Sequence, residues 1–193
     1  MDLGLTRMRQ TLKEMGEPCK YIPAIHVAGT NGKGSITCFI QNCLEAAGIR
    51  AGITTSPHLM DWCERIRANG EVIAPFALEK KIVELSSLST RHQLTPFELI
   101  IAAAFGHFAD KKIDLMILEV GMGGRLDATT AHPYRPIIAM GPISMDHCAQ
   151  LGERLRDIAM EKAAVINPGS LVISAKQSPV VKQVLEQTVL TKN

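Results

Sequence analysis

Apolar and polar residues alternate along the chain in blocks that predict strands and helices in turn. A short apolar run at residues 22–28 leads into a glycine-rich stretch, and residues 36–47 then carry apolar side chains at helical spacing. Five of these side chains share one face of the predicted helix: Ile36, Phe39, Ile40, Cys43 and Ala47. We therefore expect that face, Cys43 included, to pack against the core.

The remainder of the chain repeats this alternation. Further strands are predicted by the short apolar runs at residues 50–54, 114–119, 135–141 and 170–176. Helices are predicted at residues 75–87, from residue 95 onward, and at residues 152–166 and 178–190, whereas residues 55–73 follow no regular pattern. Strands and helices in regular alternation predict an α/β fold with a mostly parallel sheet, flanked by helices on both faces.

Composition narrows the possible functions. With 193 residues the chain can bury one substantial core, and 46% of its residues are hydrophobic. The formal net charge of +2 is too small to indicate a nucleic acid partner, and the longest apolar stretch is too short to span a membrane. Five cysteines without CxxC spacing favour free thiols and a cytoplasmic location.

The glycine-rich stretch "HVAGTNGKGS" occupies residues 26–35, between a predicted strand and a predicted helix. A strand, a glycine turn and a helix form an anion site, because backbone N–H groups and the helix dipole point at the ligand. The stretch does not match the pattern GxxxxGK[ST], since Val27 replaces the first glycine and Gly34 separates Lys33 from Ser35. Taken alone, it is compatible with a phosphate-binding loop and with an ordinary turn.

Two charged residues lie at positions that suggest chemistry. Glu119 ends a predicted buried strand, where α/β sheets place ligand-facing groups, and a carboxylate there could hold Mg²⁺ against phosphates. A strand-end acid that simply faces water is the alternative. Lys162 falls in the middle of an apolar helix stripe, so it either points into a site or extends its ammonium along the core edge to solvent.

The segment "TPFE" at residues 95–98 has a structural explanation of its own. Thr95 and Glu98 have the spacing of a capping box, and Pro96 stands at the first helical position. We interpret these three residues as a helix start. Glu64, in the irregular stretch before it, is interpreted as a solvated charge without contacts.

Seven motifs, taken together and in order, resemble a known family. They are "HVAGTNGKGS", "TSPHL", "ERIRANG", "TPFELI", "LEVGMGGRLDAT", "MDH" and "LGERLRDIAMEKAAVINPG". The order is similar to that of folylpolyglutamate synthases and dihydrofolate synthases, ATP-dependent members of the wider Mur-ligase family. This resemblance implies a P-loop NTPase-like central domain, incomplete here. Residues 1–193 would form a single partial ATP-binding domain, and the C-terminal domain that holds glutamate would be absent.

The resemblance also implies a reaction. ATP phosphorylates a carboxylate of a folate or of dihydropteroate, and the amino group of L-glutamate then attacks the acyl phosphate. Two Mg²⁺ ions would assist, and full-length members would act as monomers.

Roles for individual residues follow from the same resemblance. The ATP phosphates would be bound by Gly29, Thr30, Asn31, Gly32, Lys33, Gly34 and Ser35. The metal ligands would be Ser56, Glu119 and His147. Lys33, His147 and a carbamylated Lys162 would serve catalysis, and the folate contacts would be His58, Arg67 and Phe97.

Some features depart from the family pattern. Thr130 stands where the family usually has asparagine, and the proline-rich residues 131–144 make the position of His147 less certain. A second hypothesis is therefore a truncated, non-catalytic nucleotide-binding remnant. A peptidoglycan Mur ligase fits less well, because "TSPHL" and "TPFE" point to folate. On either hypothesis we expect residues 1–193 alone to show no glutamate-dependent phosphate release.

Overall fold

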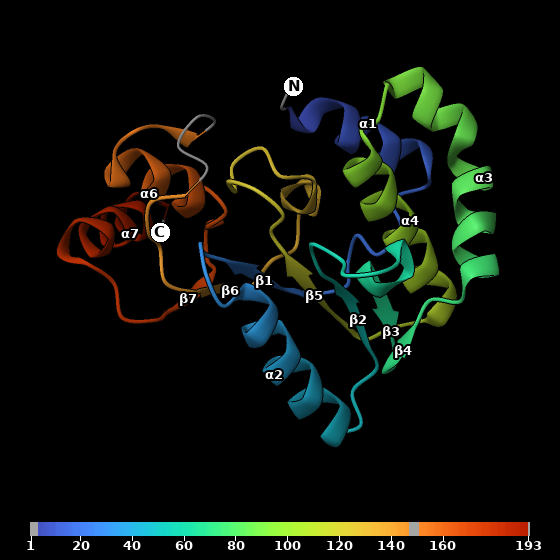
Figure 1. Cartoon of the computed structure of the whole chain (residues 1–193), viewed down its shortest axis with the longest axis horizontal. Coiled ribbons are helices and arrows are strands. Elements are labelled where there is room, and N and C mark those ends of the chain that lie inside the picture. Colours follow the sequence, from blue (N-terminus) through green and yellow to red (C-terminus); the bar gives the residue numbers. More distant parts are fainter. Residues whose placement is uncertain (1–3, 147–150, 193) are drawn as a thin grey trace.

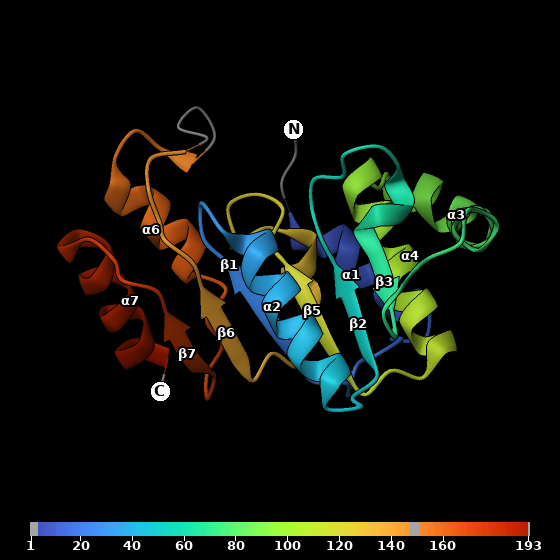
Figure 2. The same cartoon turned by 60° about the horizontal axis from the view of Figure 1, so that its bottom comes forward.

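The computed structural model describes residues 4–146 and 151–192, which are built around one seven-stranded sheet (Figures 1 and 2). Its strand order is β4-β3-β2-β5-β1-β6-β7. The strands are β1 (Ala24–Ala28), β2 (Ala51–Thr54), β3 (Ile66–Ala68), β4 (Glu71–Val72), β5 (Leu115–Glu119), β6 (Ile137–Met140) and β7 (Leu171–Ser174). The five strands from β2 to β7 in this order are parallel, whereas β3 and β4 run antiparallel to their neighbours. The mostly parallel α/β fold predicted from the sequence is confirmed.

Helices connect the strands. They are α1 (Leu5–Glu14), α2 (Lys33–Ala46), α3 (Pro75–His92), α4 (Pro96–Lys111), α6 (Leu155–Ala163) and α7 (Pro179–Lys192), with short 3₁₀ helices η1 (Trp62–Arg65) and η2 (Ala128–Ala131). Within residues 4–146 and 151–192, none of the helices combines the length and the apolar character that spanning a bilayer requires.

The two faces of the sheet are covered unequally. On one face α4 packs over β2 and β3 with α1 and α3 against it, and α6 and α7 cover β6. On the other face α2 lies over β1, β2 and β5, as its place in Figure 2 shows. The side chains of Ile25, Val27 and Ile117 meet the partly buried Ile36, Ile40 and Leu44 of α2.

The face that carries α2 is left partly bare beyond β1. The strand register places Ile137 beside Leu171 and Ala139 beside Ile173, on the same side as α2. Leu171 is 61% exposed and Ile173 is 58% exposed. The expectation that helices cover both faces is therefore met only over the central strands.

Three local predictions were wrong. Residues 55–73 are not wholly irregular, because η1, β3 and β4 lie within them, with β3 paired to β2 and β4 paired to β3. Helix α2 begins at Lys33, three residues earlier than the apolar spacing indicated. Cys43 and Phe39 are exposed instead of packed, because α2 meets the sheet through the neighbouring stripe of Ile36, Ile40 and Leu44.

Candidate functional site

The glycine loop, residues 29–35, joins the carboxyl end of β1 to the start of α2. Gly32 takes a left-handed conformation with φ of 76°, and no side chain caps the helix that follows it. Gly32, Gly34 and Ser35 are exposed. The N–H groups at the start of α2 are thus presented at an open helix N-terminus, an arrangement that suits an anion.

Two lysines meet at this loop. Lys33 Nζ donates to the carbonyl oxygens of Gly29 (3.2 Å) and Thr30 (3.1 Å), and Lys162 Nζ donates to the same Gly29 oxygen at 3.1 Å. Lys162 is only 2% exposed, so its ammonium does not extend to solvent. Burial, followed by the charge of Lys33, lowers the pKa of Lys162 to about 8. Adjacent cations of this kind favour a bound anion.

Glu119 lies beside the glycine loop as its place at the end of β5 predicts. It pairs in register with Val27 of β1, two residues before the loop. Its side chain is buried, and a Cβ on Gly34 would lie 3.9 Å from its Oε2. Burial raises the pKa of Glu119 to about 7, although the charge of Lys33 and the backbone N–H of Ser56 both favour the ionised form.

The surroundings of Glu119 fit a magnesium ion. Its Oε2 is buried and has no hydrogen-bond partner, so one carboxylate oxygen is left for a ligand. Within residues 4–146 and 151–192, no cluster of three His, Cys, Asp or Glu side chains could hold a metal by itself. Mg²⁺ does not require such a cluster, because it keeps waters and binds through one or two carboxylates plus substrate phosphates.

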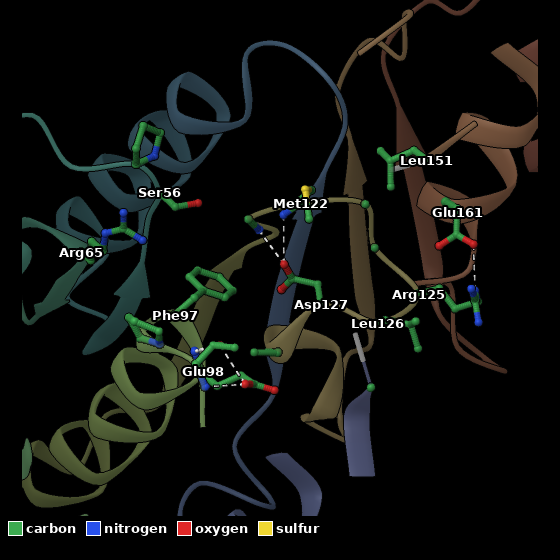
Figure 3. A pocket seen from close by; sticks show the side chains of 18 of the residues that line it. Ser56, Arg65, Phe97, Glu98, Met122, Arg125, Leu126, Asp127, Leu151 and Glu161 are labelled. Atoms are coloured by element: carbon green, nitrogen blue, oxygen red, sulfur yellow. Dashed lines mark hydrogen bonds and ion pairs between the residues drawn. The ribbon is translucent and has the colours of Figure 1, made fainter. Parts of the chain in front are cut away.

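A cavity of about 710 Å³ opens beside the loop that follows Glu119. Figure 3 shows the aromatic ring of Phe97 projecting into it from α4, opposite Leu151 and Glu161. Arginine, aromatic and backbone groups share its wall, which suits a flat ligand that carries polar groups. Its lining residues are Gly4, Arg7, Ser56, Pro57, Trp62, Arg65, Thr95, Pro96, Phe97, Glu98, Gly121, Met122, Gly123, Gly124, Arg125, Leu126, Asp127, Ala128, Leu151 and Glu161.

Comparison with known proteins identifies the family. The sequence profile described as the Mur ligase middle domain matches residues 27–189, most of the chain. The chain belongs to the Mur ligase middle domain family. The resemblance read from the seven motifs is confirmed.

Individual relatives of this Mur ligase domain make the likeness more specific. A dihydrofolate synthase/folylpolyglutamate synthase of Bacillus subtilis is 40% identical over 190 residues, covering 94% of this chain and 44% of that protein. A folylpolyglutamate synthase structure from Mycobacterium tuberculosis, complexed with ADP and AMPPCP, superimposes with a TM-score of 0.92 at 35% identity. That match covers 98% of this chain and 46% of the other.

An Escherichia coli FolC structure, in complex with DHPP and ADP, gives a TM-score of 0.92 at 32% identity, and all of this chain is covered. The match spans 46% of the FolC chain. The Mur ligase domain described here therefore spans a little less than half the length of the relatives it matches.

The structure brings some of the predicted site residues of the domain together and separates others. The glycine loop, Lys162 and Glu119 converge, and Ser56 reaches both Glu119 and the cavity. Phe97 lines the cavity. Neither His58 nor Arg67 does. His147 lies outside the described residues.

Arg65 and Trp62 occupy the cavity wall where His58 and Arg67 were expected. The Arg65 guanidinium lies 4.6 Å from the centre of the Trp62 ring, and its Nε donates to Nδ1 of His58 at 2.8 Å. His58 also lies against the Trp62 ring, with 4.7 Å between the ring centres, so it supports two residues of the cavity wall without lining the cavity itself. Arg67 sits on β3, opposite Ile53 of β2. The motif "ERIR" contains both arginines. The structure shows that Arg65, the last residue of η1, lines the cavity and that Arg67 does not.

Glu64 is not the solvated charge that the sequence suggested. Its carboxylate accepts the backbone N–H groups of Leu59 (2.8 Å), Met60 (2.8 Å) and Asp61 (2.9 Å). These bonds lower the pKa of Glu64. The side chain therefore fastens the turn between Ser56 and η1, and the interpretation as a contact-free charge was wrong.

The capping box at the start of α4 is confirmed. Thr95 Oγ1 accepts the N–H of Glu98, and the Glu98 carboxylate accepts the N–H of Thr95 at 2.8 Å. The same carboxylate accepts Arg7 Nε of α1 at 2.7 Å. The box thus also ties α1 to α4 at the cavity wall, a contact between residues 91 positions apart that no local pattern contains.

Proposed function

We propose that this chain supplies the nucleotide-binding and pterin-binding part of an ATP-dependent ligase that joins L-glutamate to dihydropteroate or to folates. One observation carries the proposal. A lysine-bearing glycine loop and a buried carboxylate with an open oxygen lie next to a cavity of about 710 Å³. Relatives that carry these names share this fold along nearly the whole chain.

The glycine loop is proposed to bind the phosphates of ATP. Backbone N–H groups at the start of α2 would face the phosphates. Lys33, which donates to the loop's own carbonyl oxygens in this structure, would donate to the phosphates instead, because they carry more negative charge. Relatives of the same fold solved with ADP and with AMPPCP support nucleotide binding by this domain.

Glu119 and Ser56 are proposed to hold Mg²⁺. When bound, the ion neutralises charge on the phosphates during transfer. Glu119 offers its unpartnered oxygen, and Ser56 lies close enough for its backbone N–H to orient that carboxylate. A second ion at His147 stays a prediction.

The cavity is proposed to take the pterin end of the folate substrate. Phe97 offers a ring for stacking, and Arg65 and Arg7 offer donors beside it. A substrate carboxylate directed at the glycine loop attacks the terminal phosphorus of ATP, and ADP leaves. The glutamate amine then attacks the carbonyl carbon of the acyl phosphate, and phosphate leaves as the amide forms. The domain contributes positioning and charge, which such a reaction chiefly requires.

Lys162 is proposed to react with carbon dioxide to form a carbamate. Only a neutral amine adds to carbon dioxide, and a pKa of about 8 makes the neutral form accessible near neutral pH. A carbamate carbon signal in NMR spectra taken with ¹³C-bicarbonate, absent from Lys162→Met, is the expected result. Equal spectra of the two proteins would remove the carbamate from the proposal and leave Lys162 as a cation.

Nucleotide titration of the chain tests the phosphate site. We expect MgADP to bind, and Lys33→Ala to weaken its affinity about tenfold or more, because a charge-assisted contact is removed. Lys13→Ala is the matched control, since Lys13 lies exposed on α1. Equal affinities for the two variants would contradict the proposed role of the loop.

The ligase activity needs a separate measurement. The intact mass of the endogenous protein decides whether residues 1–193 belong to a longer chain like those of the relatives. Glutamate-dependent phosphate release is then measured on that endogenous protein. Nucleotide binding without turnover there would favour a non-catalytic nucleotide-binding protein. A monomeric state and a cytoplasmic location stay predictions.

A further inference from the structure

The segment that follows β6 is fastened to the glycine loop. The N–H of Thr30 donates to the Pro142 oxygen at 2.8 Å. The Thr30 hydroxyl donates to the Ser144 oxygen and accepts the Ser144 N–H, both at 3.1 Å. These three bonds make the position of Thr30 depend on residues 141–144.

The two segments also touch backbone to backbone. A Cβ on Gly29 would lie 3.0 Å from the Cα of Gly141, and a Cβ on Gly141 would lie 2.9 Å from the Asn31 oxygen. Only glycine permits such a close approach. A shift of residues 141–143 is therefore transmitted to the glycine loop, because no space separates them.

One side chain from a third segment holds residues 141–143 in place. Gln177, in the connection from β7 to α7, accepts the Ile143 N–H with its Oε1 at 3.0 Å. Its Nε2 donates to the Gly141 oxygen at 2.9 Å and to the Ser174 hydroxyl at 3.1 Å. A carboxamide carries the donor and the acceptor that these two backbone groups require.

We propose that Gln177 is a positioning residue for the nucleotide, which acts through Gly141–Ile143 on Thr30 of the glycine loop. The inference rests on the proposed nucleotide site. The hydrogen bonds of Gln177 go to Gly141, Ile143 and Ser174, which all lie outside the glycine loop. Its effect on phosphate binding is therefore indirect, through two backbone bonds that fix the segment against which the loop rests.

Three variants separate this role from a general loss of stability. Gln177→Met keeps the length of the side chain and removes all three of its hydrogen bonds, whereas Gln177→Glu keeps the acceptor for Ile143 and loses the donor for Gly141. Gln183→Met is the matched control, because Gln183 lies exposed on α7 and the change is chemically the same.

Backbone amide exchange followed by NMR is the first readout. In Gln177→Met we expect faster exchange at Ile143, Thr30 and Ser144, with unchanged exchange in the centre of β1. In Gln177→Glu the Ile143 amide stays protected, since its acceptor remains. Thr30 exchange that is equal in Gln177→Met, Gln183→Met and the unaltered chain would overturn the proposal.

Affinity for MgADP is the second readout. We expect Gln177→Met to weaken it about three- to tenfold, the effect of one or two lost hydrogen bonds, and Gln183→Met to leave it unchanged. Faster Thr30 exchange with unchanged affinity would also overturn the proposal. If the unaltered chain binds no MgADP, the proposed function itself fails, and the exchange data alone then decide whether Gln177 holds the loop.

Discussion

Two buried glutamates, one at the start of a helix and one at the end of a strand, differ in how many hydrogen-bond partners they have. Glu98 lies at the start of α4 and is 6% exposed, and Glu119 lies at the end of β5 and is 3% exposed. The Glu98 carboxylate accepts bonds from Arg7 and from the backbone and hydroxyl of Thr95. Glu119 keeps one oxygen without any partner. The fold supplies Glu98 with hydrogen-bond partners and leaves one oxygen of Glu119 without any.

The difference separates structural from functional use of the same residue. A buried carboxylate with a cation and several donors contributes to stability, whereas one that lacks partners destabilises the folded state. A buried carboxylate without partners is therefore expected at a place where a bound ligand provides the missing contact. Near Glu119, Lys33 of the glycine loop, Lys162 of α6 and the exposed start of α2 indicate where that ligand would bind.

Glu98→Ala is expected to give the largest loss of stability. The substitution removes the ion pair with Arg7 and half of the capping box, so the free energy of unfolding should fall by about 3 kcal/mol. Urea unfolding checks this. Glu79→Ala, an exposed change on α3, is the control and should shift the midpoint little.

The MgADP affinity of the Glu98→Ala variant tests whether Glu98 has any part in nucleotide binding. Since Glu98 lies away from the glycine loop, the folded variant should bind MgADP as the unaltered chain does. A similar loss of affinity and stability would show that the two acids do not differ in the way described.

Glu119→Gln is expected to stabilise the folded chain at pH 8, by less than Glu98→Ala destabilises it. In the unaltered chain the pKa of Glu119 is raised from 4.5 to about 7, so protonation of this carboxylate stabilises the folded state. This contribution is complete below pH 4.5 and is lost as the pH rises through 7. At pH 8 the variant should therefore unfold about 3 °C above the unaltered chain, and near pH 4 at the same temperature.

Thermal unfolding between pH 4 and pH 8 makes this measurement, with Glu79→Gln as the control. The same Glu119→Gln variant should lose the dependence of ADP binding on Mg²⁺. A variant less stable than the unaltered chain at pH 8 would place Glu119 among the structural acids, beside Glu98.

Much of the fold could be predicted because its signals are local. Strand and helix alternation predicted the mostly parallel sheet, and the spacing of Thr95, Pro96 and Glu98 predicted a helix start that the structure contains. The apolar stripe that buries Ile158, Ala159 and Lys162 was also visible in the sequence. The hairpin of β3 and β4 was missed, since strands of three and two residues carry no periodicity.

The site was only partly predictable for the same reason. The glycine loop and Glu119 occupy positions that a strand end defines, so motifs were sufficient to find them. The contribution of Gln177, the inward turn of Arg65 and the fastening role of Glu64 depend on contacts with distant or irregular backbone. Such contacts have no spacing rule in the sequence.

The alternation of elements, the family and the residue types available for chemistry could all be recognised in the sequence. Which of these residues meet depends on how the helices pack on the sheet. Lys162 and Lys33 share one carbonyl oxygen across 129 positions of the chain, because α6 packs beside Ala28 at the carboxyl end of β1, where the glycine loop begins. Cys43 faces solvent although its spacing predicted a core position, because the sheet selects which stripe of α2 it covers. Hydrophobic spacing indicates that a face exists, and packing decides which face is used.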